Sequence, residues 1–396
     1  MKKTTYLICI PFLGLACASC QKDNVAEPIS PKEAIVFSAR TLETKGQPQL
    51  NVLEELALQD FSVSAWYSKN EKSFGEDSKH YISNHRFGTL DTQISASTQW
   101  QGIARNSNGD KSPDPVYYPL DGSLSFFCYA PYRDKDEFSD ILIKNDPDES
   151  ITSRLTNYLP NSPLIQFTPE ENVANQIDFV VADPVLDWKK EDGDIVLDFT
   201  KHLTTNLRFL CKYSGSVNAE SERIIIKTIW IQNVIGSEFL YFTKEGDALG
   251  HQWSSTVSPD GTGSMPLRSY VLSIENNSLK DRTFLSDTDF TYINYETTGQ
   301  LYLLPQAFPD RTPTMDPASD PQLHITYEIW DNQNNPIETN TLKFDLRGTE
   351  PWPMGKTLAY EITIGVAERK NLNIIKAVIV DWTNAENNHQ QEEILY

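Results

Sequence analysis

The sequence predicts an all-β protein. Apolar and polar residues alternate with a period of two in several runs of the 396-residue chain, whereas the 3.6-residue period of amphipathic helices is nearly absent. Clusters of Pro, Gly, Asn, Asp and Ser separate these runs, as expected for turns between strands. Strands with one apolar and one polar face favour antiparallel sheets that pack against each other as sandwiches.

The start of the sequence predicts an export signal. Two lysines precede an apolar run over residues 6–16, and small residues then lead to Cys20. Small residues directly before this cysteine suit a lipoprotein signal peptidase. We expect residues 1–19 to be removed, Cys20 to carry lipid, and residues 20–32 to form a tether. Cys17 is a rival acceptor of the lipid, and the alternative is a plain secretory signal that is cleaved without lipidation. The apolar run is shorter than the roughly 20 residues that a membrane span needs, so a transmembrane anchor is not expected.

Four runs show the alternation of strands most clearly, and in each the alternate apolar residues are expected on one buried face. They are Leu124, Phe126, Cys128 and Ala130; Leu207, Phe209, Cys211 and Tyr213; Leu323, Ile325, Tyr327 and Ile329; and Tyr360, Ile362, Ile364 and Val366. Further strands are expected over residues 34–39, 61–67, 178–182, 194–200, 223–233, 238–242, 300–304, 341–346 and 374–381. One short helix is expected within residues 50–60.

The chain is long enough for two domains of roughly 150–200 residues each. The polar, turn-rich segment 184–194 precedes a new strand, so we expect one sandwich over residues 33–190 and a second over residues 191–396. Long polar loops, where β scaffolds commonly bind their ligands, are expected at 68–80, 102–116, 132–175, 255–265 and 305–320.

Acidic residues outnumber basic ones, with 55 Asp and Glu against 34 Lys and Arg and a formal net charge of −21. Such a chain disfavours nucleic acids and anionic lipid headgroups as partners, because both are polyanions. Beyond Cys20, the mature chain contains Cys128 and Cys211, each in an apolar, strand-like run. We therefore expect buried free thiols and no disulfide framework.

No arrangement of residues in the sequence predicts catalysis or metal binding. The carboxylate-rich stretches lack the alternating ligands of a calcium-binding EF-hand: they are Asp146, Asp148 and Glu149; Glu191, Asp192 and Asp194; and Asp287 and Asp289. The six histidines have no zinc-site spacing, and neither a nucleophile elbow nor a phosphate-binding loop is present. We expect no enzymatic activity, no metal and no cofactor.

Aromatic residues are the remaining binding candidates, because a flat ring can pack against the apolar face of a pyranose or against a protein partner. The candidate rings are Trp66, Tyr67, Trp100, Tyr117, Tyr118, Trp230, Trp253 and Trp330. Trp100 and Trp253 lie in polar, loop-like surroundings and are the leading candidates. Burial in a sandwich core is the alternative for the whole set.

Seven strand-and-turn segments follow one another in an order that resembles the fimbrillin-like (Mfa-like) family of the Bacteroidota, over about residues 34–383. The segments are AIVFSARTLETKG, YYPLDGSLSFFCYAPY, QIDFVVAD, IVLDFTKHLTTNLRFLCKY, GQLYLLPQAF, WPMGKTLAYEITIG and VIVDWT. The resemblance implies two transthyretin-like antiparallel β-sandwich domains in tandem. It also implies a surface subunit of a fimbria (a type V pilus) or a related adhesin lipoprotein, anchored at the outer membrane.

In pilus subunits of this family, a trypsin-like protease cuts after an Arg or Lys behind the first strand, and a strand from a neighbouring subunit fills the groove that opens. The resemblance implies that residues 33–39 form this strand here, with Ile35 and Phe37 on one face, and that Arg40 or Lys45 is the cleavage site. The implied partners are other fimbrial subunits and a host or bacterial receptor, either protein or glycan.

The end of the chain departs from what a donor subunit needs. Residues 384–396 are mostly polar, and only Ile394, Leu395 and Tyr396 could anchor in a groove. A tip or anchor position therefore fits the sequence about as well as a shaft position. The alternative function is a stand-alone outer-membrane lipoprotein that binds a glycan.

Overall fold

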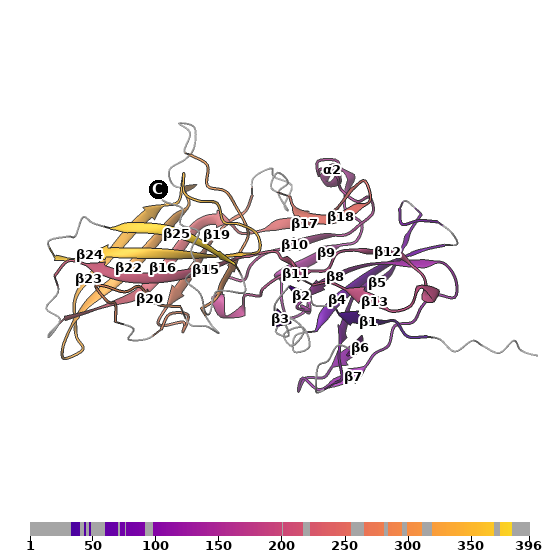
Figure 1. Cartoon of the computed structure of the whole chain (residues 1–396), viewed down its shortest axis with the longest axis horizontal. Coiled ribbons are helices and arrows are strands. Elements are labelled where there is room, and N and C mark those ends of the chain that lie inside the picture. Colours follow the sequence, from indigo (N-terminus) through magenta and orange to yellow (C-terminus); the bar gives the residue numbers. More distant parts are fainter. Residues whose placement is uncertain are drawn as a thin grey trace, which may run out of the picture. The chain divides into compact units, whose positions relative to one another are not determined.

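The chain folds almost entirely into β-strands, as the sequence predicts (Figure 1). The computed structural model of the protein describes residues 33–39, 43–44, 47–48, 60–69, 72–75, 77–91, 98–199, 201–216, 222–254, 265–280, 284–294, 299–310, 319–367 and 373–381. Outside the described residues lie the expected signal peptide (1–19), the tether (20–32), Cys17, Cys20, Arg40, Lys45, residues 384–396 and, except for Asp60, the expected helix.

The largest sheet has ten strands and contains the first strand of the described residues (Figure 1). Its strands follow the order β13 (Ile195–Leu197), β1 (Val36–Ala39), β6 (Gln99–Arg105), β5 (Lys79–Gly88), β4 (Phe61–Ser68), β8 (Ser123–Ala130), β11 (Val180–Val181) and β14 (Lys201–His202). In addition, β12 (Val185–Trp188) pairs with β8, and β7 (Lys111–Pro113) pairs with β6.

A four-stranded sheet combines strands from both halves of the sequence. Its order is β18 (Ala248–Trp253), β17 (Glu238–Glu245), β10 (Leu164–Phe167) and β9 (Ile141–Lys144). Sheet pairing therefore crosses the expected boundary at residues 190 and 191, both here and where β13 pairs with β1. The expected boundary segment itself contains β12 and the 3-10 helix η2 (Lys190–Asp192). Turn-rich composition marks a change of chain direction, and it does not report which strands pair.

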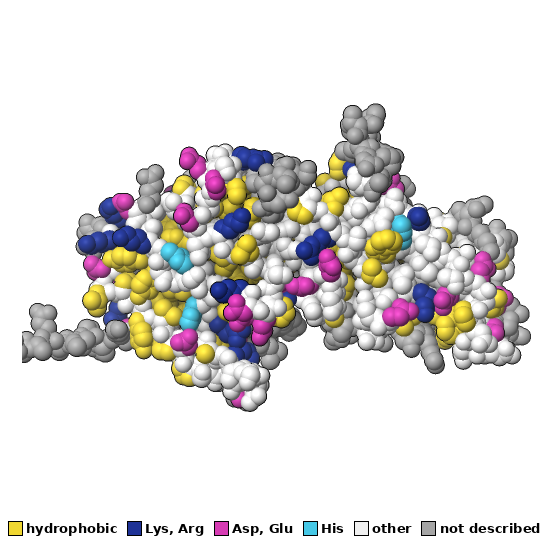
Figure 2. Space-filling view, turned by 180° about the vertical axis from the view of Figure 1, so that it is seen from behind, with side chains coloured by type: hydrophobic (Ala, Val, Ile, Leu, Met, Phe, Trp, Pro, Cys, Tyr) yellow, Lys and Arg dark blue, Asp and Glu magenta, His cyan; other side chains and the backbone are white. Residues whose placement is uncertain are grey.

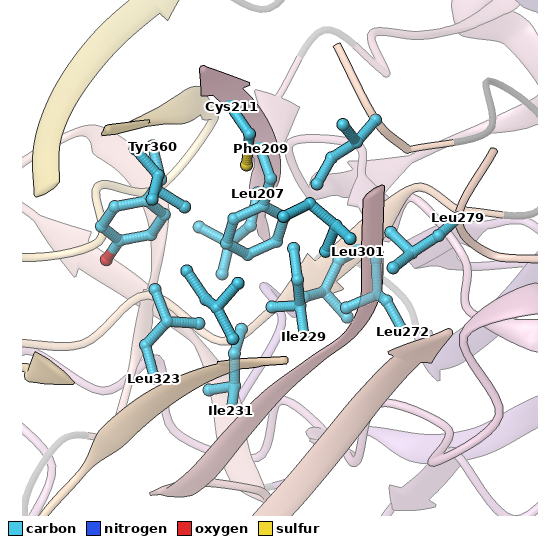
Figure 3. Close-up of a cluster of buried hydrophobic side chains, with 14 of the residues drawn as sticks. Leu207, Phe209, Cys211, Ile229, Ile231, Leu272, Leu279, Leu301, Leu323 and Tyr360 are labelled. Carbon is cyan, nitrogen blue, oxygen red and sulfur yellow. The ribbon is translucent and has the colours of Figure 1, made fainter. Parts of the chain in front are cut away.

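Two further sheets enclose the largest hydrophobic cluster. One contains β20 (Thr291–Tyr292), β15 (Thr205–Ser214), β24 (Lys356–Gly365) and β25 (Ile374–Asp381), with β21 (Leu301–Leu303) paired to β15. The other contains β19 (Leu267–Ser273), β16 (Glu222–Ile235), β22 (Gln322–Asp331) and β23 (Pro336–Asp345). Side chains from both sheets, among them Phe209, Ile229 and Leu323, point toward one another in Figure 3.

The strand faces agree with the alternation in the sequence. All four predicted members of each of the runs at 323–329 and 360–366 belong to this cluster, as do Leu207, Phe209 and Cys211. In β8, the predicted set Leu124, Phe126, Cys128 and Ala130 lies in a second cluster. The opposite face of β8 is not polar as expected, because Phe127 and Tyr129 are buried in a third cluster. The sheet is thus covered on both sides at this strand.

Several strands lie where long loops are expected. The predicted loop at 132–175 contains β9, β10, the short helix α2 (Glu149–Thr152) and the 3-10 helix η1 (Val173–Asn175). Strands β5, β6, β18 and β19 were likewise not predicted, because polar residues interrupt their alternation. The short strands β2 (Glu43–Thr44) and β3 (Gln47–Pro48) pair with each other. Two of the described pairs, β1 with β13 and β15 with β24, are parallel rather than antiparallel.

The two remaining cysteines and the charged surface agree with the composition. Cys128 and Cys211 are buried free thiols, as expected, and burial raises the pKa of both. On the face shown in Figure 2, acidic and basic side chains lie interspersed with hydrophobic ones. Among the described residues, no helix combines the length and apolar character needed to cross a bilayer.

Candidate functional site

The first strand, β1, is seated inside the ten-stranded sheet, between β13 and β6. It pairs in parallel with β13, where Phe37 lies opposite Ile195, and antiparallel with β6, where Phe37 lies opposite Trp100. Just before the strand, the backbone amide of Ile35 donates to the carbonyl oxygen of Val116 at 2.7 Å. The strand therefore has paired neighbours on both sides, and its removal would leave two unpaired strand edges.

The side chains of β1 alternate between the core and the other face, as the sequence predicts. Ile35 and Phe37 are 0% and 1% exposed, whereas Val36 and Ser38 are half-buried. The Phe37 ring makes edge-on contacts with three rings, at centroid distances of 5.9 Å to Phe61, 5.1 Å to Phe87 and 5.3 Å to Phe126. These rings come from β4, β5 and β8, so one side chain of β1 contacts three other strands of the sheet.

Two partly exposed cations pair with one buried carboxylate at the far end of β6. Asp60, directly before β4, is 1% exposed; its Oδ2 lies 2.5 Å from Nε of Arg105 and its Oδ1 lies 2.8 Å from Nζ of Lys111. Arg105 ends β6 and Lys111 begins β7. Gly88 leaves room for the carboxylate, since a Cβ there would lie 2.4 Å from Asp60 Oδ1. This cluster could not be predicted from the sequence, because Asp60 lies more than 40 residues before its two partners along the chain.

The two leading aromatic candidates take part in packing. Trp100 lies on β6 opposite Phe37 and is 1% exposed, so its ring presents no face to a ligand. Trp253 lies on β18, where its indole Nε1 donates to the carbonyl oxygen of Leu203 at 3.0 Å and its ring packs against Phe167 and Phe179. A polar sequence context thus did not mean an exposed ring, because neighbouring strands supply the cover.

The acidic stretches act locally where the structure describes their contacts. Asp148 caps α2 by accepting a hydrogen bond from the backbone amide of Ser150 at 2.8 Å, and Asp192 accepts one from the amide of Lys189 at 2.8 Å. In the part of the chain that the structure describes, no group of three His, Cys, Asp or Glu side chains is placed to hold a metal ion.

The comparisons with known proteins connect this fold to a family. A family model described as fimbrillin-like matches residues 59–382. Candidate cell adhesion proteins of known structure from Bacteroides uniformis and Bacteroides ovatus are similar at 14% and 13% identity. The alignments cover 88% and 89% of this chain and 98% and 99% of theirs, each with a TM-score of 0.42. A third, from Parabacteroides distasonis, has 11% identity and a TM-score of 0.37 over 89% of this chain and 97% of its own. No curated protein matches the chain.

Proposed function

Because the chain belongs to the fimbrillin-like family, we propose that it is a cell-surface fimbrial subunit or a related adhesin that assembles by strand exchange. The family is a structural and adhesive one and not an enzymatic one. The proposal includes a lipid anchor at Cys20 that holds the precursor at the outer membrane. It also keeps the two-sandwich organisation, with sheet pairing that crosses residue 190.

The observation that carries the proposal is the position of β1 between β13 and β6, with Ile35 and Phe37 fully buried. The strand nevertheless lies before residues 59–382, the region that the family model matches. Its removal would take away none of that region. Burial of each such side chain contributes roughly 1.5–3 kcal/mol. Removal of β1 would expose apolar surface of the core, so binding of another apolar strand in its place is strongly favoured. An incoming segment with apolar residues at alternate positions would satisfy the core and both strand edges at once.

The partners in this proposal are other fimbrial subunits, one of which supplies the strand that fills the groove, and a surface receptor. The proposal covers a shaft, a tip and an anchor position, which differ in whether the protein also donates a strand to a neighbouring subunit.

Limited digestion of the folded protein with an Arg- and Lys-specific protease tests the proposal. Intact mass would locate the cuts, and size-exclusion chromatography would report the loss of residues before the cut and any oligomers. We expect an early cut after Arg40 or Lys45, followed by uptake of an added peptide that carries apolar residues in the register of Ile35 and Phe37. Oligomers without added peptide would identify a shaft subunit, whereas peptide uptake without oligomers would identify a tip or an anchor.

The matched control is the double variant Arg40→Gln and Lys45→Gln, which should resist the early cut and retain β1. If residues 33–45 of the unmodified protein resist digestion while distant loops are cut, maturation by strand removal is wrong. If the strand is cut but neither leaves nor exchanges with the peptide, assembly by exchange at this groove is wrong.

A further inference from the structure

A pocket of about 490 Å³ lies between the turn that leads into β8 and a second wall that runs from the end of β12 into η2. Its lining includes Tyr118, Leu120 and Asp121 from the turn, and Trp188 and Lys189 from the other wall. The volume falls within the roughly 300–1,000 Å³ of small-molecule sites. None of these residues pairs with β1, although Tyr118 and Trp188 pack against the hydrophobic cluster that contains Ile35 and Phe37.

The turn that forms the first wall is held against the end of β4. Gly122 has φ +77°, and a Cβ at this position would lie 2.3 Å from the carbonyl oxygen of Ser68. Glycine therefore permits both the conformation and the close approach. The hydroxyl of Tyr67 donates to Oδ1 of Asp121 at 2.7 Å. This contact orients a carboxylate that is otherwise exposed at the pocket.

A β-bulge shapes the second wall. The pairing of β12 with β8 shifts between Val185 and Trp188, and Asp187 within the bulge has φ +55°. Bulges commonly redirect a side chain next to a functional site. The shift places Trp188 opposite Leu124, and its indole Nε1 donates to the carbonyl oxygen of Gly193 at 3.2 Å. The ring is thus fixed in orientation while half-buried.

The chemistry of the lining suits a neutral, hydroxyl-rich ligand. Two half-buried aromatic rings, Trp188 and Tyr118, supply apolar faces beside polar groups. The charges of the lining balance, because the carboxylates of Asp121 and Glu191 are matched by the ammonium groups of Lys189 and Lys190. Carboxylates accept hydrogen bonds and ammonium groups donate them, so together they can pair with sugar hydroxyl groups. Because their charges balance, the lining favours neither an anion nor a cation.

We propose that this pocket binds one pyranose unit of a neutral glycan, with Trp188 against the apolar face of the ring. Asp121 and Lys189 hold its hydroxyl groups. Leu120, which is 97% exposed at the rim, packs against the next unit of the glycan. The pocket would therefore provide the adhesive contact of the protein, an inference that rests on the adhesive role proposed above.

Saturation-transfer difference NMR on the purified protein tests the proposal with four probes: the methyl glycosides of glucose, galactose, mannose and N-acetylglucosamine. We expect saturable binding of at least one of them. Asp121→Ala and Lys189→Ala should each weaken that binding about tenfold, which corresponds to the loss of a ligand hydrogen bond. Trp188→Phe, which keeps an aromatic face, should retain most of it.

Trp230→Ala is the matched control, because Trp230 is 40% exposed on β16 and is not part of the pocket lining. It should leave the affinity unchanged. The absence of saturable binding for all four probes would overturn the proposal. So would binding that persists in both Asp121→Ala and Lys189→Ala while circular dichroism shows them folded. The digestion experiment measures the removal of β1 and not the binding of a glycan, so the failure of one proposal can be told from the failure of the other.

Discussion

The ring of Phe37 lies edge-on to the ring of Phe87, with centroids 5.1 Å apart and planes 78° apart. Phe87 belongs to β5, which is separated from β1 by β6 in the sheet, so this contact ties the first strand to the sheet beyond its immediate neighbour. Edge-to-face pairs contribute about 0.5–1.5 kcal/mol beyond the burial of the rings. The first strand is therefore held by side-chain packing as well as by backbone pairing.

Phe37→Ala should strongly destabilise the protein. Phe37 is 1% exposed and contacts three other rings, so truncation leaves a cavity and should lower the free energy of unfolding by about 3–5 kcal/mol. Urea unfolding followed by circular dichroism measures the change. Leu142→Ala, at a position 52% exposed on β9, is the control and should change the value by about 0.5 kcal/mol or less. Equal effects of the two substitutions would show that β1 is not packed as described.

Asp60→Asn should also be destabilising, through loss of a buried charge. The substitution leaves the guanidinium of Arg105 and the ammonium of Lys111 without their carboxylate. Breaking a buried pair costs about 3–5 kcal/mol, and the partial exposure of both cations favours the lower end. Asp77→Asn removes the carboxylate of an exposed pair with Lys72 and should lower the free energy of unfolding far less, because solvent screens that pair. Chemical denaturation of both variants makes the comparison.

Glu238 should make the protein less stable as the pH rises. It is 2% exposed, and burial raises its pKa from 4.5 to about 8. Between pH 4.5 and about pH 8, the folded protein thus keeps a proton on Glu238 that the unfolded chain has released. The contribution of the protonated carboxyl to the free energy of unfolding is complete below pH 4.5. It is lost as the pH rises to about 8, at up to about 1.4 kcal/mol per pH unit.

Urea unfolding at pH 5 and at pH 8 measures this loss. Glu238→Gln, which carries no titratable proton, should reduce the difference between the two pH values. Glu245→Gln, at the exposed end of the same strand, should leave it unchanged. A difference that is the same in Glu238→Gln as in the unmodified protein would show that the carboxyl is not the source.

His251 should make the protein less stable as the pH falls. Its side chain is 3% exposed, with Nδ1 3.8 Å from Oδ1 of Asp183. Burial lowers its pKa from 6.5 to about 4, the charge of Lys201 acts in the same direction, and Asp183 opposes both. As the pH is lowered, the unfolded chain therefore binds a proton at a higher pH than the folded protein does. The contribution of this histidine to stability is complete above pH 6.5 and is lost as the pH falls to about 4.

Two measurements check this behaviour. In ¹H NMR, the ring resonance that disappears in His251→Gln should titrate with a midpoint well below 6.5 in the unmodified protein. The same variant should lose less stability between pH 7 and pH 5 than the unmodified protein does. A midpoint near 6.5 would place His251 in contact with solvent, contrary to the structure.

The sequence was sufficient where the governing physics is local. Successive side chains of a strand point to opposite faces, so the period of two assigned Ile35 and Phe37 to one buried face without knowledge of the neighbouring strands. The same rule located both buried thiols. It missed the strands at 141–144 and 164–167, which are four residues each and too short for a periodic signal.

The all-β class, the faces of the long strands and the resemblance to a fimbrillin-like family were determined by the sequence alone. Only the tertiary structure decided which strands pair: β1 lies beside β13, and the hydroxyl of Ser38 donates to the carbonyl oxygen of Ile195, 157 residues away. It also decided that Trp100 is buried, that Asp60 meets Arg105 and Lys111, and that Trp188 faces a pocket. The physical reason is that periodicity depends on the geometry of a few adjacent residues, whereas pairing depends on the competition between distant segments for the same strand edges and the same core.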